Sequence, residues 1–226
     1  MPRLRPYAAV IFDLDGTLID TETLCNQTGV ETCARLGLTV SLATFETLAG
    51  VHDAERVRRL SAWTGTAIDL ASFNALWDDL SYVRFKDGIP LKPGAWDLLV
   101  WIKDRGLPIA IATSSRRQPA LTKIDTVGFR PFLQAIVTCD DVAHAKPAPD
   151  AYLLAATLLA VAPADCLVFE DSETGARAAW DAGMTVVQVP DIHPASGDFA
   201  HHVAPSLLEG ARMAGLWPDP APASLA

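Results

Sequence analysis

Short apolar runs that end in polar residues recur along this chain, and they constrain its fold more than any other feature. Five such runs are present: Ala8–Phe12, Leu107–Ala112, Ala135–Val137, Cys166–Phe169 and Thr185–Val189. Between the last four lie amphipathic segments of helical length: Arg116–Gly128, Asp150–Val161 and Ser172–Gly183. Short strands that are apolar throughout and alternate with helices indicate a parallel sheet covered on both faces. The sequence therefore predicts an α/β fold with a Rossmann-like parallel sheet at its core.

The stretch between the first two runs departs from this pattern. Residues 20–88 contain no good strand candidate, and their patterns are helical, as in Asp53–Trp63 and Ser72–Phe85. A crossover helix needs far fewer residues, so this stretch is predicted to be an inserted all-helical domain. We therefore expect an α/β core from residues 1–19 and 89–217 and a helical domain from residues 20–88. The proline-rich residues 218–226 are expected to form a flexible tail.

The composition limits the classes of partner. The chain has 226 residues, half of them hydrophobic and a fifth charged, which excludes an intrinsically disordered protein. Its 18 Lys and Arg against 27 Asp and Glu give a net charge of −9, which argues against nucleic acid and anionic membranes. The sequence does not specify an oligomeric state.

Cysteine usage and hydropathy predict where the protein works. Cys25, Cys33, Cys139 and Cys166 are irregularly spaced with no CxxC pair, which favours four reduced thiols over disulfides or a zinc site. The first apolar run is too short for a signal peptide, and the longest uncharged stretch, Ala151–Ala164, is too short to span a bilayer. We expect a soluble, cytoplasmic protein.

Polar residues with catalytic potential follow the apolar runs. The first run is followed by Asp13-Leu14-Asp15-Gly16-Thr17, the second by Thr113-Ser114-Ser115 and the fourth by Glu170-Asp171-Ser172, while Lys146 precedes the helix expected from Asp150. Ligands of open parallel sheets bind outside the carboxyl ends of the strands. Carboxylates, hydroxyls and one lysine should therefore gather at one edge of the sheet.

This combination suits metal-assisted phosphoryl transfer. Neighbouring carboxylates repel one another and favour binding of a hard cation such as Mg²⁺. One carboxylate can attack phosphorus to form an aspartyl-phosphate, and a second, two residues on, can protonate the leaving oxygen and then deprotonate water. Lys146 and the hydroxyl and backbone N–H of Thr113 can hold the phosphoryl oxygens. Each of these residues, considered alone, is explained as a helix cap or a solvated side chain. Their joint occurrence, in order, at the ends of successive strands favours a catalytic site.

The four motifs together resemble those of the haloacid-dehalogenase superfamily of aspartate-nucleophile hydrolases, over essentially the whole chain. They are Val10-Ile11-Phe12-Asp13-Leu14-Asp15-Gly16-Thr17-Leu18, Ile111-Ala112-Thr113-Ser114-Ser115, Lys146-Pro147-Ala148-Pro149-Asp150 and Val168-Phe169-Glu170-Asp171-Ser172. The helical insertion is similar to the cap domain of the branch that includes β-phosphoglucomutase, phosphoglycolate phosphatase, sugar-phosphate phosphatases and pseudouridine-5′-phosphatase.

The resemblance implies a role for each motif residue. Asp13 would be the nucleophile and Asp15 the general acid and base. Thr113 and Lys146 would bind the phosphoryl oxygens, with Ser114 as a further substrate contact.

The resemblance also implies a Mg²⁺ site. The ion would be held by Asp13, the backbone carbonyl of Asp15 and Asp171, with Glu170 beside it.

Two residues that directly follow motifs, Glu22 and Arg116, are candidates for contacts with the leaving group of the substrate.

The sequence accordingly predicts a Mg²⁺-dependent phosphatase for a small phosphate ester, of the sugar phosphate or nucleoside monophosphate type. Asp15 argues against halide displacement, because the dehalogenases of the family lack this second acid. A phosphomutase is an alternative, although Cys25 and Asp53 stand where the mutase has a histidine and a cap arginine. A phospho-aspartate signalling module without turnover is an alternative of another class.

Overall fold

The computed structural model describes residues 7–48, 51 and 53–218, and the chain forms two compact units. The first unit comprises Met1–Ile19, Leu91–Ala120 and Gly128–Ala226, and the second comprises Asp20–Pro90 and Leu121–Val127. Apart from Pro218, the expected tail at residues 218–226 lies outside the described residues.

A six-stranded sheet forms the centre of the first unit, with every pair of neighbouring strands parallel. The strands lie in the order β3-β2-β1-β4-β5-β6. Their bounds are β1 Ala9–Phe12, β2 Ile109–Ala112, β3 Ala135–Val137, β4 Cys166–Glu170, β5 Thr185–Gln188 and β6 His202–Val203. The predicted α/β class is confirmed, and each of the five apolar runs matches one of the strands β1 to β5. The edge strand β6 was not predicted, because two residues beginning with a histidine carry no apolar pattern.

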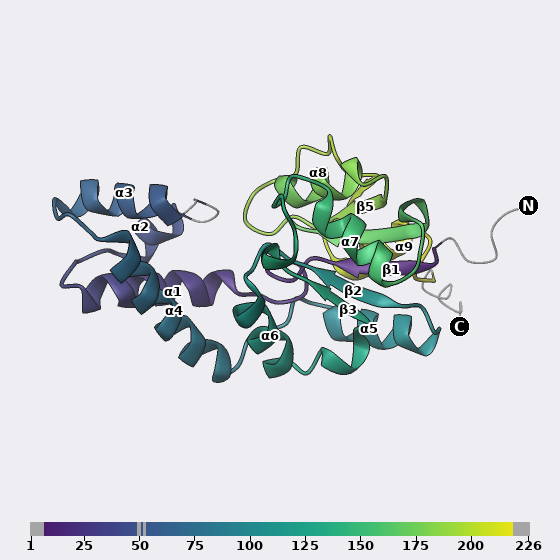
Figure 1. Cartoon of the computed structure of the whole chain (residues 1–226), viewed down its shortest axis with the longest axis horizontal. Helices are drawn as coiled ribbons and strands as arrows, with labels where there is room; N and C mark the ends of the chain where they lie inside the picture. Colours follow the sequence, from purple (N-terminus) through teal and green to yellow (C-terminus); the bar gives the residue numbers. More distant parts are fainter. Residues whose placement is uncertain (1–6, 49–50, 52, 219–226) are drawn as a thin grey trace, which may run out of the picture. The chain divides into compact units, whose positions relative to one another are not determined.

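Helices cover both faces of this sheet (Figure 1). On one face α7 and α8 contact each other and strands β1 to β5, and on the other α9 contacts α5, β5 and β6. The helices of this unit are α5 Ala95–Asp104, α7 Asp150–Leu158, α8 Glu173–Asp181 and α9 Leu207–Met213, with short 3₁₀ turns η1 Arg130–Phe132, η2 Cys139–Asp141 and η3 Pro163–Asp165. Helix α6, Arg117–Thr126, begins in this unit, and its last residues belong to the second.

The strand register places the ends of β1, β2 and β4 side by side. Phe12 is paired with Ile111 of β2 and with Phe169 of β4, and all three residues are buried. Beyond Phe12, the backbone N–H of Asp13 donates to the carbonyl of Phe169 at 3.0 Å. Because the strands are parallel, the polar residues that follow them emerge at one edge of the sheet.

In its described residues, the second unit contains the end of α6 and the helices α1 Glu22–Arg35, α2 Leu42–Glu46, α3 Asp53–Thr64 and α4 Leu70–Lys86. Its core is small and partly aromatic, with Phe45 and Phe73 each in ring contact with Trp77. The remaining buried members of this core are Cys33, Leu38, Leu48, Val57 and Leu60. None of the helices described in either unit is both long and apolar enough to cross a membrane.

Candidate active site

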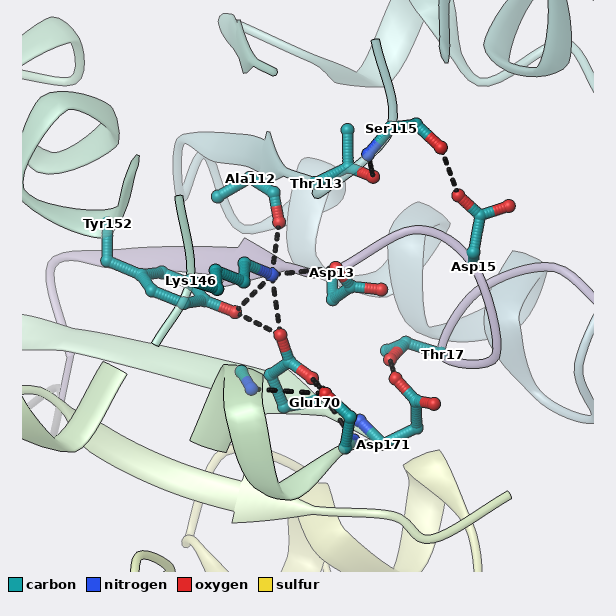
Figure 2. A network of polar contacts seen from close by, with 12 residues as sticks. Asp13, Asp15, Thr17, Ala112, Thr113, Ser115, Lys146, Tyr152, Glu170 and Asp171 are labelled. Carbon is teal, nitrogen blue, oxygen red and sulfur yellow. Dashed lines mark hydrogen bonds and ion pairs between the residues drawn. The ribbon is translucent and has the colours of Figure 1, made fainter. Parts of the chain in front are cut away.

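Lys146 is the centre of a buried polar cluster at the carboxyl edge of the sheet (Figure 2). Its Nζ lies 2.7 Å from Oδ1 of Asp13 and 2.6 Å from Oε1 of Glu170, and it donates to the carbonyl of Ala112 at 2.9 Å. The side chains of Lys146, Asp13 and Glu170 are only 3%, 8% and 1% exposed. The lysine therefore joins the ends of β1, β2 and β4 through one ammonium group.

Glu170 is the last residue of β4 and is held on both of its oxygens. Oε1 accepts from the hydroxyl of Tyr152 at 2.7 Å, in addition to Lys146. Oε2 accepts from the backbone N–H groups of Asp171 and Ser172 and from the Ser172 hydroxyl, at 3.1–3.2 Å. The carboxylate thus sits against the first turn of α8, where the helix dipole favours negative charge.

Two glycines let the acidic groups approach the backbone. A Cβ added at Gly175 in α8 would lie 1.7 Å from Oε1 of Glu170, so any side chain there would displace this carboxylate. Gly16 has φ of +83°, and a Cβ there would lie 2.5 Å from Oδ2 of Asp171. Asp171 also accepts a hydrogen bond from the Thr17 hydroxyl at 3.1 Å, so the turn after β1 packs directly against the turn after β4.

Asp15 points away from this cluster and toward the loop that follows β2 (Figure 2). Its Oδ2 accepts a hydrogen bond from the hydroxyl of Ser115 at 2.8 Å. The two acids of the first motif are therefore held by different partners, Asp13 by Lys146 and Asp15 by Ser115.

The predicted role of Thr113 needs one correction. Its backbone N–H donates to the carbonyl of Val137 at 2.9 Å, because it continues the ladder between β2 and β3, so it does not face a substrate oxygen. Its hydroxyl oxygen accepts from the backbone N–H of Ser115 at 3.0 Å, and the residue is buried. The neighbouring Ser114 is exposed.

Burial and mutual repulsion perturb the acids of the cluster. Burial raises the pKa of Asp13 well above its usual range, with Glu170 acting in the same direction and Lys146 opposing it. Burial, Glu170 and Asp13 likewise raise the pKa of Asp171. Burial alone would lower the pKa of Lys146, but the carboxylates of Asp13 and Glu170 outweigh it and raise that pKa. The cluster holds more negative than positive charge, and a cation would relieve the difference.

The donor set fits a hard divalent cation. Asp13, Glu170 and Asp171 each offer a carboxylate oxygen, and these oxygens lie within 4.8 Å of one another. Mg²⁺ prefers hard oxygen ligands, and one or two carboxylates often bind it together with water or phosphate oxygens. The Asp15 carboxylate is not one of these three, and the contribution of its backbone carbonyl stays a prediction.

Of the two predicted leaving-group contacts, one lies in each unit. Glu22 is the first residue of α1 in the helical unit and is partly buried, and Arg116 is exposed in the loop before α6. Both assignments remain predictions.

Sequence reasoning missed Ser115, Thr17 and Tyr152. Ser115 and Thr17 lie inside two of the four motifs of the sequence, so their place near the site could be predicted, but their hydrogen-bond partners could not. Nothing in the sequence pointed to Tyr152, because it lies in an apolar helix, where a tyrosine is usually a core residue.

Comparisons with known proteins find similar chains that are named as phosphatases. Fructose-1-phosphate phosphatase YqaB of Escherichia coli (strain K12) is 31% identical over 183 residues, which cover 81% of this chain and 96% of the relative. Hexitol phosphatase A of the same organism is 34% identical over 181 residues, covering 79% and 81% of the two chains. The crystal structure of a mutant of CbbY from Rhodobacter sphaeroides in complex with xylulose-(1,5)bisphosphate superposes with a TM-score of 0.74, at 29% identity, covering 88% and 94%.

The sequence also matches the family described as haloacid dehalogenase-like hydrolase over residues 7–183, a span that contains all four motifs. Together with the capped α/β fold and the acidic cluster at its sheet edge, this match confirms the resemblance stated from the motifs. The chain belongs to the haloacid dehalogenase-like hydrolases, and among them to the phosphatases.

Proposed function

We propose that this protein is a Mg²⁺-dependent phosphatase that hydrolyses a small phosphorylated sugar through an aspartyl-phosphate on Asp13. The observation that carries the proposal is the placement of the Asp13 carboxylate at the end of β1, 2.7 Å from a buried lysine and beside two further acids. The sugar class is supported by relatives named for fructose 1-phosphate and hexitol phosphates, and by a similar fold bound to xylulose bisphosphate. We place the enzyme in the cytoplasm, because Cys25, Cys33, Cys139 and Cys166 are all free thiols, as is usual for cytosolic proteins.

In the first step, an oxygen of Asp13 forms a bond to the phosphorus of the ester while the bond from phosphorus to the leaving oxygen breaks. Asp15 gives its proton to that oxygen, so the sugar departs as a neutral alcohol. Lys146 stabilises the negative charge of the transferring group, and the hydroxyl of Thr113 orients it. Bound to Asp13, Asp171 and the Asp15 carbonyl, with Glu170 adjacent, Mg²⁺ would neutralise charge between the acids and the phosphoryl group.

In the second step, water attacks the phosphorus of the aspartyl-phosphate. Asp15, now a carboxylate, takes a proton from the water as the bond between phosphorus and the Asp13 oxygen breaks. Inorganic phosphate leaves, Asp13 returns as a carboxylate and Asp15 regains its proton. The balance is one ester and one water consumed for one alcohol and one phosphate released.

Turnover of a panel of phosphorylated sugars and nucleosides, with and without Mg²⁺, tests the proposal. Wild-type protein should release phosphate in proportion to the ester consumed, whereas a mutase would return the phosphoryl group to the substrate. Asp13→Asn should abolish release while circular dichroism remains unchanged. Persistent turnover by this variant would contradict the mechanism, and a long-lived phosphorylated wild type without turnover would indicate a signalling module.

A further inference from the structure

Ser115 occupies a rigid position in the loop after β2. Its backbone N–H donates to the Thr113 hydroxyl at 3.0 Å, and its carbonyl accepts from the N–H of Cys139 at 3.3 Å. Two residues on, the N–H of Arg117 donates to Oδ2 of Asp140 at 2.8 Å. The loop is thus fastened to the turn η2 after β3 at Ser115 and at Arg117, which holds the backbone from which the Ser115 hydroxyl extends.

That hydroxyl joins the loop to the turn after β1. It donates to Oδ2 of Asp15 at 2.8 Å, and Figure 2 shows that this contact directs Asp15 away from Lys146 and Asp13. This hydrogen bond occupies one oxygen of the Asp15 carboxyl group and therefore favours one orientation of that group, whether or not it carries a proton. Asp15 is therefore held apart from the groups that hold the nucleophile.

Proton transfer requires this kind of control. A general acid must lie within hydrogen-bond reach of the atom that it protonates, about 2.6–3.2 Å. We propose that Ser115 is a positioning residue that fixes the Asp15 carboxyl for proton transfer to the leaving oxygen. This inference rests on the proposed function and assigns to Ser115 a role that Thr113 and Lys146, which contact the phosphoryl group, do not have.

The proposal predicts a dependence on the leaving group. An alkoxide leaves poorly without a proton, so hydrolysis of a sugar phosphate needs a well-placed Asp15. In p-nitrophenyl phosphate the leaving group departs as a stable phenolate, so its transfer to Asp13 needs little help from an acid. Because kcat/KM reports the steps up to departure of the first product, it separates the two substrates even though both share the later hydrolysis step.

The experiment compares Ser115→Ala with wild type on p-nitrophenyl phosphate and on the sugar phosphate that wild type turns over fastest. The variant should lose about 10- to 100-fold in kcat/KM on the sugar phosphate, a part of the roughly 10²–10⁴-fold that a positioned general acid contributes. On p-nitrophenyl phosphate the loss should be less than about threefold. Ser115→Thr, which keeps the hydroxyl, should recover most of the activity on the sugar phosphate.

A matched control removes a serine hydroxyl elsewhere in the same unit. Ser206→Ala deletes the hydroxyl that caps α9, where it accepts from the N–H of Glu209 at 3.2 Å, and should leave both kcat/KM values near wild type. Equal losses of Ser115→Ala on both esters would assign Ser115 a merely structural role and overturn the inference, as would unchanged values. A wild type that hydrolyses neither ester would instead overturn the proposed function itself.

Discussion

Helices α8 and α1, which belong to different units, each have a glycine against which another side chain packs, and the two contacts differ in kind. In α8 of the α/β unit, a Cβ at Gly175 would overlap the carboxylate of Glu170. In α1 of the helical unit, a Cβ at Gly29 would lie 2.0 Å from Cζ of Phe45. Gly175 thus leaves room for a carboxylate at the carboxyl edge of the sheet, and Gly29 leaves room for an aromatic ring in an apolar core.

An ion-paired cluster from each unit shows a similar difference. Lys146 lies between two carboxylates that are almost completely buried, whereas Glu55 in α3 pairs with Arg58 and Arg59 at the surface. Burying charge is costly, and buried ion pairs are weak stabilisers compared with apolar packing of the same volume. The α/β unit therefore places charge where stability alone would not favour it, which is typical of a catalytic site.

The largest effect is expected from Lys146→Met, which removes the cation and leaves the carboxylates facing one another. The kcat on a sugar phosphate should fall by at least about 10²–10³-fold, since a donor to the transferring group is lost. Without divalent metal, the free energy of unfolding in urea should fall by about 3–5 kcal/mol, the usual result of removing one partner of a buried pair.

Lys92→Met is the matched control for this variant. Lys92 forms one ion pair with Asp191 at 2.6 Å in the same unit, and both side chains are about one fifth exposed. This control should keep kcat near wild type. If Lys146→Met also kept it, the buried cation would have no part in catalysis.

A smaller effect is expected from alanine at the two glycines. Each methyl group must displace its neighbour, so Gly175→Ala and Gly29→Ala should each lower the free energy of unfolding by about 1–3 kcal/mol. In an unobstructed helix the same change would stabilise by about 1 kcal/mol. Only Gly175→Ala should lower kcat, because it moves Glu170 and with it Lys146. An equal loss of kcat in Gly29→Ala would remove the distinction between the two contacts.

Sequence reasoning reached the elements of this site but not its internal contacts. The apolar runs predicted β1 to β5. Because parallel strands end at one edge of a sheet, the sequence also predicted that Asp13, Thr113 and Glu170 lie close together. No periodicity predicts that Tyr152 of an apolar helix turns its hydroxyl to Glu170, or that the hydroxyl of Ser115 reaches Asp15. Such contacts join residues far apart in the sequence, and they depend on register and rotamers that packing decides.

The smallest effect concerns the surface ion pair of the helical unit. Hydrogen bonds from Arg58 and Arg59, at 2.6–2.8 Å, lower the pKa of Glu55 from 4.5 to about 2. Because the pKa of the folded protein lies below that of the unfolded chain, any stabilisation by Glu55 is complete above pH 4.5 and is lost as the pH falls toward 2.

A ¹³C titration of the Glu55 carboxyl should therefore have its midpoint near pH 2. Arg58→Gln combined with Arg59→Gln should return it toward the ordinary value, and high salt should act in the same direction because exposed charges are screened. A wild-type midpoint at the ordinary value would show that the two arginines do not hold the carboxylate in solution. Glu55→Gln should leave kcat unchanged. Glu55 forms a surface ion pair in α3, whereas Lys146 lies in the buried cluster that is proposed to bind the phosphoryl group.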